Sequence, residues 1–174
     1  YNHGMGAAHA DFNGDGELDL YVADLGADQL WFGPFPDGAD HAVALGIAEA
    51  TQRHSGWHPV IRDFDRDGWP DVFVAASGTV ADLSDFDALA RHQPVPPTPQ
   101  VDHLLLNRIH YAPHEHADRY SDPSLAHFDA VEIPHRGSAA AAAEARAASD
   151  DLDRDRDYDI AVVTVGEFRL LRLR

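Results

Sequence analysis

The sequence contains no cysteine, no lysine and no long apolar run. The absence of cysteine excludes disulfide bonds, thiolate metal sites and cysteine nucleophiles. A membrane-spanning helix needs roughly 20 consecutive apolar residues, whereas no apolar run here is longer than the short alanine tract at 139–143. The nucleophile elbow of serine hydrolases, the phosphate-binding glycine loop and the HExxH zinc motif are also missing. We therefore expect neither a membrane span nor an enzyme active site.

Positive charge is scarce. Thirty Asp and Glu residues face 13 basic residues, all of them Arg, which gives a formal net charge of −17. Such a surface repels phosphate backbones, so we expect no nucleic-acid partner. General acidity can simply keep a protein soluble. Here the acidic residues gather in a few short segments, and clustering of this kind points to a bound cation.

An acidic loop followed by an apolar run occurs three times. The copies align without gaps as DFNGDGELDLYVAD from Asp11, DFDRDGWPDVFVAA from Asp63 and DLDRDRDYDIAVVT from Asp151. We call residues 11–19, 63–71 and 151–159 loop 1, loop 2 and loop 3. Acidic residues or Asn recur at positions one, three, five and nine of each loop. The apolar residues that follow alternate, which predicts half-buried β-strands carrying Leu20 and Val22, Val72 and Val74, and Ile160 and Val162.

A second apolar run follows each of these strands. Leu30 and Leu170 lie equally far behind Asp19 and Asp159, whereas the matching Leu104 lies much farther behind Asp71. The middle unit therefore carries an insertion at about 79–100, and a second insertion at about 110–123 precedes loop 3. The prolines of the first insertion predict an extended surface loop. By the same alignment, the alanine tract belongs to the strand before loop 3.

The three loops have the chemistry of calcium sites. Calcium takes about six to eight oxygen ligands, and glycine at position six of such a loop permits the sharp turn. We therefore expect about three structural calcium ions. The candidate ligands, with a backbone carbonyl at position seven, are Asp11, Asn13, Asp15, Glu17 and Asp19; Asp63, Asp65, Asp67, Trp69 and Asp71; and Asp151, Asp153, Asp155, Asp157 and Asp159.

Two other interpretations of the loops fit the sequence less well. An EF-hand requires a bidentate Glu at position twelve and flanking helices, but that position holds Val22, Val74 and Val162 beside strand-like patterns. Acidic turns also form without metal, because Asp and Gly favour turns. Three copies in register, each followed by the same strand, favour the metal interpretation. Loop 3 should be the weakest site, because Arg156 replaces the glycine at position six.

These motifs resemble the FG-GAP/VCBS repeats of integrin-α-type β-propellers. The order of GMGAAHADFNGDGELDLYVAD, LLLNR, AHFDAVEIP and RGSAAAAAEARAASDDLDRDRDYDIAVVT is most similar to cartilage-acidic-protein-like (ASPIC/UnbV-type) proteins. The resemblance implies an all-β fold of four-stranded antiparallel blades, with calcium at the loop joining the first two strands of a blade. It also implies about seven blades, of which residues 1–174 supply about three and polypeptide outside them the rest.

The resemblance implies a role outside the cytoplasm, whether extracellular, at the cell surface or periplasmic. We expect a secreted calcium-binding module that binds or scaffolds a protein or glycan partner through its propeller loops. The alternative is the propeller part of a carbohydrate-active enzyme such as a polysaccharide lyase.

Histidine is unusually frequent, with 12 residues. His110, His114 and His116, beside Glu115, could bind zinc or copper. They lie on no recognisable helix, so we expect a solvated loop, and the same for His3, His9, His54 and His58.

Overall fold

Almost all the regular structure in the computed structural model is β-strand. The structure describes residues 3–35, 38–76, 101–109, 127–134, 145–164 and 167–172. Its elements are β1 (Gly6–Ala10), β2 (Asp19–Ala23), β3 (Gln29–Trp31), α1 (Ile47–Thr51), β4 (Gly56–Arg62), β5 (Asp71–Ala76), β6 (Val101–Asn107), β7 (Phe128–Pro134), β8 (Ala145–Asp150), β9 (Asp159–Thr164) and β10 (Glu167–Arg172).

The strands form three antiparallel sheets, which confirms the predicted all-β class. Sheet A has the order β1-β2-β3, sheet B β4-β5-β6-β7 and sheet C β8-β9-β10. Within the described residues, sheet B has the predicted four strands. Sheet A continues beyond β3 with a single bridge between Trp31 and Asp40, and the short helix α1 follows.

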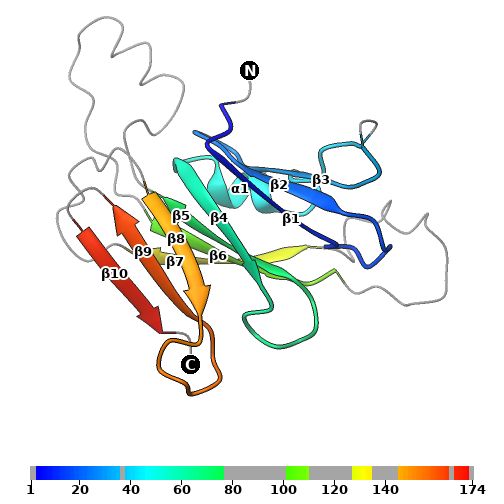
Figure 1. The fold of residues 1–174 in the computed structure, drawn as a ribbon. Helices are drawn as coiled ribbons and strands as arrows, with labels where there is room; N and C mark the ends of the chain where they lie inside the picture. The colour runs from blue at the N-terminus through cyan, green and yellow to red at the C-terminus, as the bar shows by residue number, and fades with distance from the viewer. Residues whose placement is uncertain are drawn as a thin grey trace, which may run out of the picture.

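Sheet B lies between sheets A and C (Figure 1). The first strands of the three sheets contact one another in the order β1, β4, β8. The sheets therefore stand in a row, with sheets A and C at its two ends.

The strand register confirms the alignment of the repeats. Leu30 lies opposite Tyr21, Leu104 opposite Phe73, and Leu170 opposite Ala161. In each sheet, the residue opposite this leucine lies two residues after the aspartate at position nine. Leu104 is therefore the equivalent of Leu30, although it lies much farther along the chain from its loop. The insertions at 79–100 and 110–123 and the alanine tract lie outside the described residues.

Two apolar cores hold the row together. One core joins sheets A and B and contains Tyr21, Leu30 and Val72. The other joins sheets B and C and contains Phe73 and Ile160. The prediction of half-burial is wrong for β5, which is buried along its whole length. The reason is its place in the middle sheet, where both faces of the strand meet a neighbouring sheet.

The contact between neighbouring sheets repeats. Counting from the first aspartate of each loop, even positions ten and twelve and odd positions eleven and thirteen face opposite sides of the strand. The odd residues of β2 share a core with the even residues of β5, and the odd residues of β5 share the next core with the even residues of β9. We call this odd-on-even packing. Its residues are Tyr21 and Ala23 on Val72 and Val74, and then Phe73 and Ala75 on Ile160 and Val162.

A glycine permits the close approach of sheets A and B. A Cβ on Gly6 of β1 would lie 2.3 Å from the backbone carbonyl oxygen of Trp57 in β4, and 3.0 Å from Pro59 Cδ. The obstacle nearest to that Cβ is backbone, which cannot rotate away. No side chain therefore fits at this position without separating the two first strands.

We expect Gly6→Ala to lower the free energy of unfolding by about 1–3 kcal/mol, the usual effect of overpacking. The matched control is Gly26→Ala, because a Cβ there meets nothing within 4 Å. Thermal melts of both variants measure the difference. Equal melting temperatures would contradict the close approach of β1 and β4.

Candidate metal centres

The three acidic loops occupy equivalent places in the three sheets. Loop 1 joins β1 to β2, loop 2 joins β4 to β5, and loop 3 joins β8 to β9. Each loop thus connects the first two strands of its sheet, as the resemblance implied. All three loops therefore lie at the same kind of strand junction.

The loops share one pattern of internal hydrogen bonds. The position-six N–H donates to the position-one carboxylate, as from Gly16 to Asp11 (2.9 Å), from Gly68 to Asp63 (3.0 Å) and from Arg156 to Asp151 (3.1 Å). The position-seven N–H donates to the position-five carboxylate in all three loops. Three stretches of different sequence therefore adopt the same turn.

The aspartate at position nine is buried and braces the loop. Asp19 accepts hydrogen bonds from the backbone N–H groups of Phe12 (2.7 Å) and Gly33 (3.0 Å). Asp71 accepts the equivalent bonds from Phe64 (2.7 Å) and Asn107 (2.8 Å). The carboxylate thereby ties the start of the loop to the end of the third strand of its sheet.

Asp159 repeats half of this brace in loop 3, where it accepts a hydrogen bond from the N–H of Leu152 (3.1 Å). Position nine, predicted as a metal ligand, thus has a structural task that sequence spacing did not reveal.

Two groups of carboxylates come close enough to share one ion. In loop 2, ligand atoms of Asp63, Asp65 and Asp71 all lie within 4.8 Å of one another, and in loop 3 those of Asp151, Asp153 and Asp155 do so. Loop 1 carries an amide at the equivalent of Asp65, where Asn13 Nδ2 donates to Asp15 Oδ2 (2.9 Å). Oxygen-only donor sets suit hard divalent ions such as calcium.

The backbone of each loop is left-handed at two positions. The sequence predicted a left-handed residue at position six but not at position four. The φ angles at positions four and six are 73° and 88° at Gly14 and Gly16, 65° and 94° at Arg66 and Gly68, and 64° and 77° at Arg154 and Arg156. Gly14 was the sequence signal for position four. Loop 1 therefore meets this demand with two glycines, loop 2 with one and loop 3 with none.

Replacing Arg156 by glycine should relieve strain in loop 3. A left-handed residue with a Cβ costs roughly 1–2 kcal/mol, so Arg156→Gly should raise the free energy of unfolding by up to about that amount. Arg156→Ala is the matched control, because it removes the charge and keeps the Cβ. Chemical denaturation in excess chelator compares the two variants. A gain that is equal for alanine and glycine would show that charge, rather than backbone strain, limits loop 3.

Arginines contact the carboxylates of loops 2 and 3. Arg108 donates to Asp65 (2.6 Å), Asp67 (2.9 Å) and Asp129 of β7 (3.1 Å). Hydrogen bonds to Asp65 and Asp129 raise the pKa of Arg108 above its ordinary value. In the structure, Arg108 thus supplies positive charge to two candidate ligands. Sequence spacing could not find this residue, because it lies far from loop 2 along the chain.

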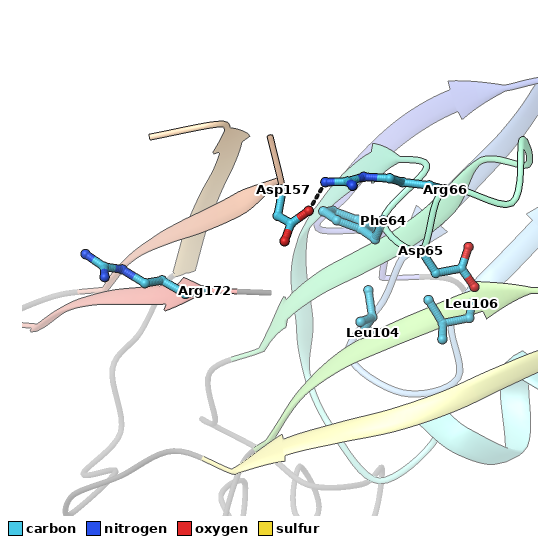
Figure 2. Close-up of a pocket in the computed structure, with 7 residues that line it drawn as sticks. All are labelled: Phe64, Asp65, Arg66, Leu104, Leu106, Asp157 and Arg172. Atoms are coloured by element: carbon cyan, nitrogen blue, oxygen red, sulfur yellow. Dashed lines mark ion pairs between the residues drawn. The ribbon is translucent and has the colours of Figure 1, made fainter. Parts of the chain in front are cut away.

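A second arginine links loops 2 and 3. Arg66 of loop 2 forms an ion pair with Asp157 of loop 3 (Figure 2). It also donates to the backbone carbonyl of Arg156. Arg172 at the end of β10 lies 3.7 Å from Asp153. The Arg66–Asp157 pair connects sheet B to sheet C at the loop end of the strands, whereas the Arg172–Asp153 pair lies within sheet C.

The same region encloses a cleft between sheets B and C. Its volume is ≈ 680 Å³. Apolar side chains and a rim of both charges line it, with Arg66 reaching across to Asp157 (Figure 2). The lining residues are Phe64, Asp65, Arg66, Leu104, Leu106, Asp157 and Arg172.

Burial makes the negative charge of the bracing aspartates costly. Desolvation raises the pKa of Asp71 from 3.8 to about 6, although the N–H groups of Asn107 and Phe64 lower it. The pKa of Asp19 also rises to about 6, chiefly by burial. A bound divalent cation would favour the ionised form and reverse these shifts.

These shifts predict different pH dependences without and with calcium. A folded-state pKa above the unfolded value contributes stability at low pH that is lost as pH rises through about 6. In chelator, the stability of the wild type relative to Asp71→Asn should therefore fall between about pH 4 and pH 7. In calcium, the ionised form of Asp71 is favoured, so that difference should stay nearly constant over the same range and fall only at lower pH. Denaturation curves at several pH values measure both, and parallel curves for the two proteins in chelator would contradict the assignment.

The described histidines differ in burial. His103 of β6 is buried, and its ring centroid lies 4.8 Å from that of His54. Burial and the neighbouring His54 lower the pKa of His103 to about 4. The expectation that His54 is solvated is therefore wrong, because it packs on a buried ring. His58 is half-buried, while His3 and His9 are exposed. His110, His114 and His116 lie outside the described residues.

Comparison with known families supports the repeat. The model of the FG-GAP-like repeat family matches residues 11–74, which extend from loop 1 into β5. Searches of curated proteins and of solved structures gave no significant match. In the described part of the chain, every helix is too short or too polar to cross a membrane.

Proposed function

We propose that this chain is a calcium-binding β-propeller module that binds or scaffolds a partner outside the cytoplasm. The observation that carries the proposal is the threefold recurrence of one acidic loop, with the same hydrogen bonds, at the same junction in three stacked sheets. The family match over residues 11–74 supports it.

In this proposal calcium has a structural role. The side chains at positions one, three, five and nine, with the carbonyl at position seven, would surround an ion in each loop. In loop 2, calcium would share Asp65 and Asp67 with Arg108 or displace it. Magnesium fits these loops less well, because it demands near-ideal octahedral geometry and keeps its waters.

Sheets A, B and C would be consecutive blades. Contacts between successive first strands and divergence of the later strands suit a propeller, whose first strands line the central axis. The remaining blades would come from outside residues 1–174.

The partner would be a protein or a glycan that meets the loops. The cleft beside loops 2 and 3 combines apolar and charged groups, as recognition sites do. We propose binding rather than catalysis, because the loop carboxylates already serve backbone N–H groups and arginines. We propose a location outside the cytoplasm, because calcium modules with dissociation constants of about 10⁻⁴–10⁻³ M are extracellular ones.

Calcium should raise the stability of the folded protein. At a few millimolar calcium, each such site should add on the order of 1 kcal/mol to the free energy of unfolding. Melts in chelator, in calcium and in equal magnesium test this, and the melting temperature should climb with calcium concentration. A melting temperature that is the same in chelator and in calcium would refute the calcium sites.

Substitutions in single loops test which loops are responsible for the stabilisation by calcium. Asp155→Ala and Asp67→Ala should each remove about one site's share of the gain. Asp129→Asn is the matched control, because Asp129 contacts Arg108 but lies outside loop 2. It should keep the full response to calcium.

A further inference from the structure

The carboxylates at positions three and five of loop 2 each use one oxygen within the loop. Asp65 Oδ1 accepts a hydrogen bond from the backbone N–H of Asp67 (3.3 Å), and Asp67 Oδ1 accepts one from that of Trp69 (2.9 Å). The second oxygen of each group, Oδ2, accepts from the same nitrogen, Nη1 of Arg108, at 2.6 Å and 2.9 Å. One cationic nitrogen therefore bridges the two oxygens that these backbone contacts leave for a metal ion.

The backbone holds Arg108 beside loop 2. Its N–H donates to the carbonyl of His127 (2.8 Å). The preceding residue, Asn107, is fully buried, and it donates from its N–H to Asp71 (2.8 Å) and from its side chain to the carbonyl of Pro70 (3.2 Å). These contacts do not involve the guanidinium. The side chain of Arg108 can therefore leave the carboxylates, or be replaced, while the backbone next to it stays fixed.

Loop 1 provides a comparison within the same chain. By the alignment of the leucines, Pro34 is the equivalent of Arg108, and loop 1 has one carboxylate fewer among positions one, three, five and nine. Its position three is Asn13, whose Nδ2 donates to Asp15 Oδ2 (2.9 Å). A nitrogen thus contacts the position-five Oδ2 in both loops, from within loop 1 and from outside loop 2. The additional carboxylate of loop 2 comes with an additional cation.

We propose that Arg108 is a tethered counter-ion of loop 2, which calcium must displace from Asp65 and Asp67 in order to bind. Calcium and guanidinium on the same two oxygens would be close together and would repel each other. The side chain of Arg108 is 23% exposed and those of the two aspartates 28% and 32%, so water screens these charges less than it screens a fully exposed pair.

Two consequences follow for loop 2. Arg108 stabilises the loop when calcium is absent, and it weakens the affinity of the loop for calcium. The inference rests on the calcium sites of the proposed function and adds that loop 2 binds its ion by exchange for a side chain of the same protein.

Titration of calcium into loop 2 alone tests the exchange. A parent protein with Asp15→Ala and Asp155→Ala, which disable loops 1 and 3, lets calorimetry report on loop 2. In this parent, Arg108→Gln should bind calcium at least about tenfold more tightly, because two charged hydrogen bonds no longer have to be broken. Arg108→Lys retains the positive charge, so its affinity should lie closer to that of the parent than to that of Arg108→Gln.

Arg62→Gln is the matched control. It removes one positive charge from the exposed residue that directly precedes loop 2. The contacts described for Arg62 are with the carbonyl of Ile61 and the ring of Tyr158 rather than with a loop carboxylate. Its affinity for calcium should stay within about twofold of the parent, because salt screens charges that are exposed and not in contact.

Thermal melts in chelator give a second readout that needs no bound ion. As a single variant, Arg108→Gln should melt about 2–4 °C below the wild type, because Asp65 and Asp67 lose their counter-ion. The two melting temperatures should converge as calcium rises, since calcium then replaces the guanidinium in the wild type. These melts use single variants, so they decide the question even if the doubly substituted parent does not fold.

The possible failures are distinguishable. Equal calcium affinities of Arg108→Gln and Arg62→Gln, or melting temperatures that stay equally far apart at all calcium concentrations, would overturn the exchange and leave the calcium sites standing. Weaker binding by Arg108→Gln would also overturn it, because Arg108 would then position the carboxylates for the ion. A wild type and variants that all fail to respond to calcium would refute the calcium sites, and the exchange with them.

Discussion

A buried carboxylate at the ninth position of each acidic loop is the contact on which the architecture depends. Asp71 accepts one backbone hydrogen bond from Phe64 in loop 2 and another from Asn107, the last residue of β6. Hydrogen bonds to charged groups contribute about 1.5–3 kcal/mol each, and their loss would leave buried N–H groups without partners. This carboxylate therefore fixes the conformation of the loop and the end of the third strand together.

The same arrangement creates an electrostatic problem. Asp19 and Asp71 are buried beside other carboxylates, and burial opposes their charge. The chain meets the excess negative charge in two ways. In loop 2, Arg108 contacts Asp65 and Asp67, and between loops Arg66 contacts Asp157. A divalent cation would also neutralise this charge, and in loop 2 it would compete with Arg108 for Asp65 and Asp67.

The sequence predicted the strands, the loop junctions and the pairing of Leu104, because three aligned copies of a repeat define which residues are equivalent. It did not predict that β5 is buried on both faces, since that depends on which sheet stands in the middle. Arg108 was missed because its partners are distant in sequence. Gly14 indicated a left-handed residue at position four of loop 1. Arginine at position four of loops 2 and 3 gave no such indication.

The acidic loops and the interfaces between sheets meet at position two of each loop. The backbone N–H of Phe12, Phe64 and Leu152 donates to the buried aspartate of the same loop. The side chain of Phe12 packs in the core between sheets A and B, and Phe64 packs against the core between sheets B and C. A change that loosens the loop therefore also displaces a residue of the interface. Loop 3 has the most strained backbone, and its position-two residue, Leu152, is 53% exposed. Because the N–H of Leu152 donates to Asp159, an ion that orders loop 3 would also restrict Leu152.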